Sequence, residues 1–257
     1  MCRTEFGDLA HPAGCTTVVA RGKDGQFLVG HNEDGGPPQI GLLYMLRVEP
    51  DGEPAFLSLT YAGQIPGNGP SFNDKGIVTV TNNISTPGPR SGIPRYAVTR
   101  KLMQAKSIDE AIATVTTPGR AFDFHYAIIS ASEQRAVGIE VTPDAHHVTE
   151  IGDRYVHTNH CVADSFRNDE RIAQRPNTVI RYETAERLLN NIPPPANLAD
   201  LGGIIANHEE DPNTICAHPG EELKRATLGS ALMDTSTRTM RIYSGPPCQG
   251  TFSDHVL

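Results

Sequence analysis

The sequence predicts an α+β fold in which mainly antiparallel sheets pack together and helices cover them from outside. Three observations support this prediction. Short β-type segments fill the first third of the chain, a pair of helices follows, and strands, helices and a last hairpin then return. Elements segregated along the chain in this way indicate sheets with helices on their outer faces, whereas a doubly wound sheet alternates strands and helices. At 257 residues, the chain can form one large domain or two smaller ones.

The strands are predicted from runs of apolar and β-branched residues that lie between turn residues. Turns such as Lys23-Asp24-Gly25 and Asn73-Asp74-Lys75-Gly76 have the composition of hairpin connections. The predicted strands cover residues 15–21, 26–30, 42–48, 55–61, 76–82, 126–130, 136–141, 147–151 and 154–158, and a last hairpin joins 227–233 to 239–243.

Helices are predicted where capping signals precede helical segments. The first runs from Pro94 to Ala105, because proline suits the opening turn of a helix. The second begins at Ser107, which has a glutamate three residues later as in a capping box, and it ends before Pro118. Two further helices are expected at 178–189 and 198–207.

Composition and charge exclude several classes of protein. The net charge of −8 and the lack of a basic run argue against a nucleic-acid partner. No apolar stretch is long enough to span a membrane, and the start of the chain lacks a secretory signal. The five cysteines are widely spaced and include no C-x-x-C pair, so we expect a cytoplasmic protein without a disulfide framework or a zinc ribbon. They are Cys2, Cys15, Cys161, Cys216 and Cys248.

The pair Gly14-Cys15, before a β-type run, suggests a nucleophile that becomes the N-terminal residue after cleavage. Cutting the chain between Gly14 and Cys15 would give one residue both a thiol and a free α-amine. Such an amine titrates near pH 7.7–8.0, so at neutral pH part of it can act as a general base. The alternative is that Cys15 is simply a small buried apolar residue.

Three polar groups accompany this thiol. Asp34 follows the next predicted strand and could orient the α-amine or hold a substrate cation, or it could be a turn aspartate beside Gly35. Asn159 closes the strand at 154–158 and offers an amide donor of the type that stabilises an oxyanion. Lys224 and Arg225, before the last hairpin, could place a cation at a strand end or be exposed surface charges.

A metal site is the competing interpretation of the segment around Asn159. His157, His160 and Cys161 are all residue types that bind transition metals. However, His157 and His160 are separated by an odd number of positions, so on a strand their side chains would face opposite sides.

In this order, the motifs resemble the cysteine N-terminal-nucleophile hydrolases of the isopenicillin-N acyltransferase and β-alanyl-amine (carcinine) hydrolase family. The resemblance covers nearly the whole chain. The motifs are Arg3-Thr4-Glu5-Phe6, Gly14-Cys15-Thr16-Thr17, Gly30-His31-Asn32-Glu33-Asp34, Phe72-Asn73-Asp74-Lys75-Gly76, His157-Thr158-Asn159-His160-Cys161, Ile215-Cys216, Ala226-Thr227-Leu228 and Met233-Asp234.

The resemblance implies a role for each matching residue. Cys15 would be the nucleophile exposed by self-cleavage after Gly14, and residues 1–14 a short propeptide or the remnant of a longer one. Asp34 would hold the new α-amine, and Asn159 would donate to the oxyanion with Asn83 as a secondary candidate. The site cation aligns with Lys224 or Arg225, of which we choose Arg225.

We therefore expect a four-layer αββα sandwich in which residues 15–257 form a single catalytic domain. Its expected activity is that of a self-processing amidohydrolase or acyltransferase on small N-acyl amides or thioesters, with no metal and no organic cofactor. The alternatives are an acyl-CoA-dependent N-acyltransferase, a non-catalytic relative that acts as a binding protein, and the transition-metal protein described above. A homo-oligomer is compatible with all of them.

Overall fold

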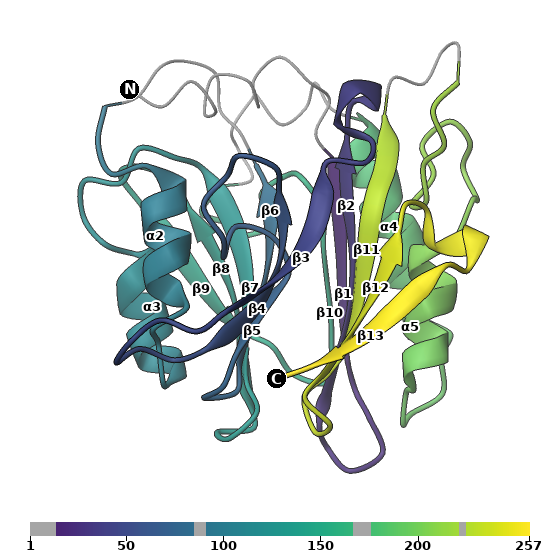
Figure 1. Cartoon of the computed structure of the whole chain (residues 1–257). Coiled ribbons are helices and arrows are strands. Elements are labelled where there is room, and N and C mark those ends of the chain that lie inside the picture. Colours follow the sequence, from purple (N-terminus) through teal and green to yellow (C-terminus); the bar gives the residue numbers. More distant parts are fainter. Residues whose placement is uncertain (1–13, 85–90, 167–175, 221–224) are drawn as a thin grey trace.

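Two antiparallel sheets pack face to face, and helices cover the outer face of each, in a computed structural model that describes residues 14–84, 91–166, 176–220 and 225–257 (Figure 1). Helices α2 and α3 cover one sheet, and helices α4 and α5 cover the other. This arrangement confirms the predicted four-layer αββα sandwich. The proposed propeptide, apart from Gly14, lies outside the described residues.

The first sheet has six strands in the order β10-β1-β2-β11-β12-β13, and every neighbouring pair is antiparallel. Strand β1 begins at Gly14 and pairs with β2 along its whole length, whereas its pairing with β10 begins at Thr17. The strands are β1 (Gly14–Arg21), β2 (Phe27–Gly35), β10 (Arg154–His157), β11 (Ala226–Asp234), β12 (Thr239–Ser244) and β13 (Phe252–Val256), with the 3-10 helix η2 (Pro247–Gln249) between the last two.

The second sheet has seven strands, paired in chain order from β3 to β9. They are β3 (Leu43–Val48), β4 (Phe56–Tyr61), β5 (Ser71–Asn73), β6 (Ile77–Asn83), β7 (Phe124–Ser130), β8 (Arg135–Val141) and β9 (His146–Glu150).

The four helices described are α2 (Arg95–Leu102), α3 (Ile108–Val115), α4 (Pro176–Asn190) and α5 (Leu198–Ile205). Ser107 caps α3 as expected, because its side chain accepts a hydrogen bond from the backbone N–H of Glu110. The Glu110 carboxylate, however, accepts from the N–H of Lys106 and not from Ser107, so only half of the expected capping box forms. None of the helices in the described ranges combines the length and apolar character needed to cross a bilayer.

Three apolar clusters hold the four layers together. One lies between the two sheets and includes Val19, Val29 and Val80. The others join the seven-stranded sheet to α2 and α3, and the six-stranded sheet to α4 and α5. Because side chains alternate along a strand, odd-numbered residues of β1 face the second sheet and even-numbered ones face α4 and α5.

The strands differ from the prediction mainly in polar or short segments. The predicted strand 26–30 extends to Gly35, because the polar residues 31–34 are buried and pair with β1 on one side and β11 on the other. Two strands were not predicted from the sequence: the short β5, and the edge strand β13, which has mainly exposed residues.

Candidate functional site

Cys15 is the second residue of β1, and the sequence predicted a strand that begins at this position. It is buried, and its side chain shares the inter-sheet face of β1 with Val19. Cys15 lines a pocket whose other walls come from the end of β2, from the second sheet and from α2. The N-terminal end of this strand therefore places a buried thiol beside a pocket.

Glu33 lies next to the Cys15 thiol, although no role was predicted for it from the sequence. It lies opposite Cys15 in the register of β1 and β2, and its Oε2 is 3.9 Å from the Cys15 Sγ. The Tyr61 hydroxyl donates to the same carboxylate at 2.8 Å, and the His31 Nε2 lies 3.1 Å from its other oxygen. A fixed carboxylate therefore faces the sulfur.

Burial raises the pKa of the Cys15 thiol well above its ordinary value, and the charges of Glu33 and Asp34 raise it further. Removing the sulfur from water disfavours the thiolate, and nearby carboxylates repel it. The uncleaved chain therefore holds a protonated thiol at neutral pH, and the sulfur needs a base to become a nucleophile.

Glu33→Gln is expected to increase the alkylation rate of Cys15 at pH 8 by roughly several-fold, because removing a negative charge lowers the thiol pKa and increases the thiolate fraction. The folded protein is treated with iodoacetamide and then digested with trypsin. The tryptic peptide that spans residues 4–21 comes only from chains not cut between Gly14 and Cys15, and its alkylated fraction gives the rate. Glu53→Gln changes an exposed carboxylate and is the control, for which we expect no change. An unchanged or slower rate in Glu33→Gln would contradict this electrostatic account.

The backbone N–H of Cys15 donates to the Asn159 Oδ1 at 2.8 Å. The Nδ2 of the same amide donates to the backbone carbonyl of Asn83 at 2.9 Å. The structure thus brings together three predicted site residues from β1, the end of β6 and the segment after β10. Strand β10 ends at His157, so Asn159 lies beyond the strand and not within its last residues.

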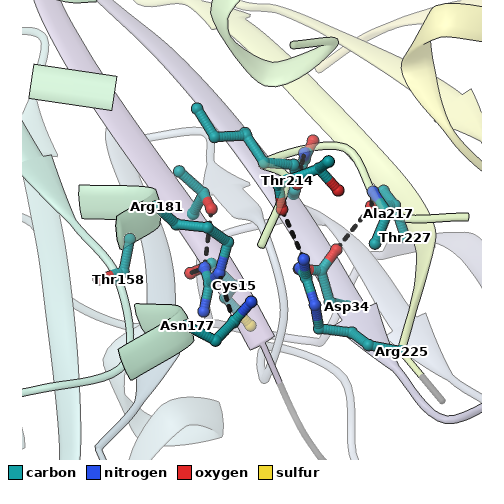
Figure 2. Close-up of polar contacts among 12 residues, drawn as sticks. Cys15, Asp34, Thr158, Asn177, Arg181, Thr214, Ala217, Arg225 and Thr227 are labelled. Carbon is teal, nitrogen blue, oxygen red and sulfur yellow. Dashed lines mark hydrogen bonds and ion pairs between the residues drawn. The ribbon is translucent and has the colours of Figure 1, made fainter. Parts of the chain in front are cut away.

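Arg181 on α4 joins this group, although sequence reasoning missed it (Figure 2). Its guanidinium donates to the Cys15 carbonyl at 2.9 Å and to the Asn159 Oδ1 at 2.7 Å. Burial lowers the pKa of Arg181 to about 10, helped by the nearby Arg225, so the side chain remains charged at neutral pH. The sequence held one signal for this residue: at helical spacing, Arg181 lies on the same buried face of α4 as Thr178 and Ala185.

Asp34 lies on the opposite face of β2 from Glu33 and forms a buried ion pair with Arg225 (Figure 2). The Thr227 hydroxyl donates to its other oxygen at 2.7 Å. The structure excludes the interpretation of Asp34 as a turn aspartate, since it is a buried strand residue. Arg225 is likewise buried and not a surface charge. Lys224, the other candidate cation, lies outside the described residues.

Gly14 is packed against this ion pair. A Cβ at this position would lie 2.9 Å from the Arg225 Cδ, 3.0 Å from the Asp34 Oδ2 and 3.4 Å from an Arg181 nitrogen. A side chain would therefore displace the charged groups, and the close approach of the chain explains the glycine. The bond that joins Gly14 to Cys15 lies directly among the predicted site residues.

The pocket above Cys15 carries both charge signs. Glu33 forms part of its wall, and Arg95 of α2 forms another part. The Arg95 guanidinium lies over the rings of Tyr96 and Phe124, at 4.4 and 4.2 Å from their centroids. Such stacking holds a guanidinium in place at little cost in hydration. Charged groups of both signs therefore line the pocket.

The metal site expected as an alternative at His157, His160 and Cys161 does not form in the parts of the chain that the structure describes. The two ring nitrogens of His157 contact the Glu140 carboxylate and the Thr158 carbonyl. Next to the thiol, Cys15, His31 and Glu33 do have potential ligand atoms within 4.8 Å of one another. Both ring nitrogens of His31 are already engaged, one by Thr17 and one by Glu33.

Solved structures with the same arrangement are N-terminal-nucleophile hydrolases. A mutant of the conjugated bile acid hydrolase of Clostridium perfringens has a TM-score of 0.65 and 12% identity, covering 95% of this chain and 92% of that one. The N-acylethanolamine-hydrolyzing acid amidase ortholog of Caenorhabditis elegans has a TM-score of 0.62 and 14% identity, covering 86% and 93%. The chain thus has the αββα fold of the N-terminal-nucleophile hydrolases.

The family model for acyl-coenzyme A:6-aminopenicillanic acid acyl-transferase matches residues 20–249, and the chain belongs to this family. The β-alanyl-dopamine/carcinine hydrolase of Drosophila melanogaster is 26% identical over 271 residues, which cover 93% of this chain and 66% of that protein. The 40 kDa form of the Emericella nidulans acyl-coenzyme A:6-aminopenicillanic-acid-acyltransferase is 26% identical over 251 residues, which cover 95% and 69%. The chain spans about two thirds of the length of these relatives. The family predicted from the sequence motifs is confirmed.

Proposed function

We propose that this protein is a self-processing cysteine amidohydrolase or acyltransferase that acts on small N-acyl amides through an acyl-enzyme on Cys15. The observation that carries the proposal is the position of Cys15. Cys15 lines the pocket, its N–H donates to Asn159, and its carbonyl accepts from Arg181. These contacts fix the backbone on both sides of the residue that must attack.

Self-cleavage would begin when the Cys15 sulfur attacks the carbonyl carbon of Gly14. The C–N bond to Cys15 then breaks, its nitrogen takes up the thiol proton, and the acyl group is carried on sulfur as a thioester. Water hydrolyses this thioester and releases the segment that ends at Gly14, regenerating the thiol. Asp34 supports this step, because its Oδ2 lies beside Gly14 and can accept a hydrogen bond from the new α-amine.

In turnover, the freed α-amine would act as the base that the buried thiol requires. It removes the proton from sulfur as the sulfur attacks the substrate carbonyl, and it returns the proton to the leaving amine. The Asn159 Nδ2 has two hydrogens, of which one is donated to the Asn83 carbonyl, and the other would be donated to the oxyanion. Water then releases the acyl group in hydrolysis, and an acceptor amine releases it in transfer.

The pocket supports a polar acyl or amine group on the substrate. Glu33 can pair with a cationic end and Arg95 with an anionic end. Two relatives carry out the two outcomes that the acyl-enzyme allows, since one is named a β-alanyl-dopamine/carcinine hydrolase and the other an acyltransferase. We place amide hydrolysis first, because it requires no acceptor site.

The test is a search for the acyl-enzyme by intact-mass spectrometry. Protein that has lost residues 1–14 is mixed with N-acyl amides that differ in the charge of the acyl group, and the reaction is quenched in acid. We expect an acyl adduct on the peptide that begins with Cys15, and its transfer to added hydroxylamine. A protein that keeps residues 1–14 and forms no adduct would instead be the non-catalytic relative.

A further inference from the structure

A second group of cysteine and histidine side chains lies away from the pocket. His208, Cys216 and His218 lie in the segment after α5, where His208 is the third residue beyond the helix end, and Cys248 is in η2. Potential ligand atoms of all four lie within 4.8 Å of one another. Cys216 is buried, whereas the other three are exposed to solvent. We call these four residues the Cys2His2 cluster.

The spacing of these atoms is that of a tetrahedral metal site. With zinc–sulfur bonds of about 2.3 Å and zinc–nitrogen bonds of about 2.0–2.1 Å, two sulfur ligands lie about 3.8 Å apart, and a sulfur and a nitrogen about 3.6 Å apart. The sulfurs of Cys216 and Cys248 are 3.7 Å apart. The His218 Nε2 is 3.9 Å from the first sulfur and 3.1 Å from the second, on either side of the ideal value.

His208 completes the set, since its ring centroid lies 5.2 Å from that of His218. Two cysteines with two histidines form one of the usual ligand sets of structural zinc, and a closed set of four protein ligands leaves no position for a substrate. A disulfide fits less well, because the two sulfurs would have to approach to about 2.04 Å. We propose that the Cys2His2 cluster binds a structural zinc ion.

The proposed zinc would support the catalytic end of the molecule. Cys216 is followed by Ala217, whose N–H donates to the Thr227 Oγ1 at 2.9 Å, and the Thr227 hydroxyl donates to Asp34 (Figure 2). An ion shared by Cys216 and Cys248 would fasten the segment after α5 to η2. It would thereby hold the backbone that positions the Asp34 carboxylate. The zinc acts on the site only through this backbone and does not contact the substrate.

Zinc content is the first measurement. Protein purified without chelators is expected to contain about one zinc per chain by mass spectrometry of metals. Cys248→Ser, at an exposed position of the cluster, is expected to lose it. Cys161→Ser, outside the cluster, is the matched control and should retain it. Cobalt(II) added to metal-free protein should give the visible absorption of a tetrahedral cobalt–thiolate site. His208→Ala should reduce both the zinc content and this cobalt absorption.

Stability gives a second readout that does not depend on activity. A strong chelator is expected to lower the melting temperature of the wild-type protein and of Cys161→Ser, but not that of Cys248→Ser. Circular dichroism shows that each variant is folded before it is compared. Wild-type protein that contains no zinc and takes up none from micromolar zinc chloride would overturn the proposal. A Cys216–Cys248 disulfide that persists under reducing conditions in the presence of zinc would also overturn it.

Discussion

Cys15→Ala is expected to leave the chain at full length and to abolish amide hydrolysis. The alanine has no group that can attack the Gly14 carbonyl, and without cleavage no α-amine is available as a base. Cys15→Ser is expected to cleave slowly or not at all, because a hydroxyl is a weaker nucleophile than a thiol. Intact-mass spectrometry of the purified variants measures the loss of residues 1–14 directly.

Cys2→Ala is the matched control for this prediction. Cys2 also follows directly on a residue that a cut could remove, but it lies outside the Gly14-Cys15-Thr16-Thr17 motif that carries the family resemblance. Normal cleavage and activity are therefore expected in Cys2→Ala. Recovery of fully processed Cys15→Ala protein would rule out self-cleavage by this thiol, and another protease would then be the cause.

Asn159→Ala is expected to reduce turnover by roughly 100- to 1000-fold, the usual cost of losing one oxyanion donor. The alanine also removes the acceptor for the Cys15 N–H and for Arg181. Asn159→Asp separates these roles, because a carboxylate can still accept both hydrogen bonds but cannot donate to an oxyanion. We expect it to be at least as damaging as the alanine, with substrate affinity almost unchanged in both.

The variants at position 159 must be compared in processed form, because the same donor would also assist self-cleavage. Expression with Met placed directly before Cys15 provides this form when the cell removes the Met. His160→Ala is the control, since the His160 ring contacts the Thr158 and Thr178 hydroxyls. Near wild-type turnover in processed Asn159→Ala, together with a loss in His160→Ala, would mean that the two roles are reversed.

The layers of the fold were predictable because their signals are local. Turn residues, alternating side chains and helix caps act within a few positions, and they located β1, β6 and α3 closely. The length of β2 was not predictable in this way. Its polar end from His31 to Asp34 is stable as a strand only because β1 and β11 pair with it on both sides.

The candidate site was predictable only where a residue belongs to a motif near a strand end. Cys15, Asn159 and Arg225 meet this condition, whereas Arg181 reaches the Cys15 carbonyl across 166 positions of sequence. Nothing local distinguishes Lys224 from Arg225, because they are adjacent cations before a strand. The contact that marks Arg225, its ion pair with Asp34, joins positions 191 residues apart.

The central position of β1 has a consequence for the lifetime of the mature enzyme. If the chain is cut before Cys15, the new first residue remains paired with Glu33 in the sheet, and Asn159 and Arg181 hold its nitrogen and carbonyl. Aminopeptidases must pull a terminal residue out into an extended groove, and this residue is not free to leave. The fold would therefore protect the catalytic thiol from loss by trimming of a single residue, without any chemical block on the amine.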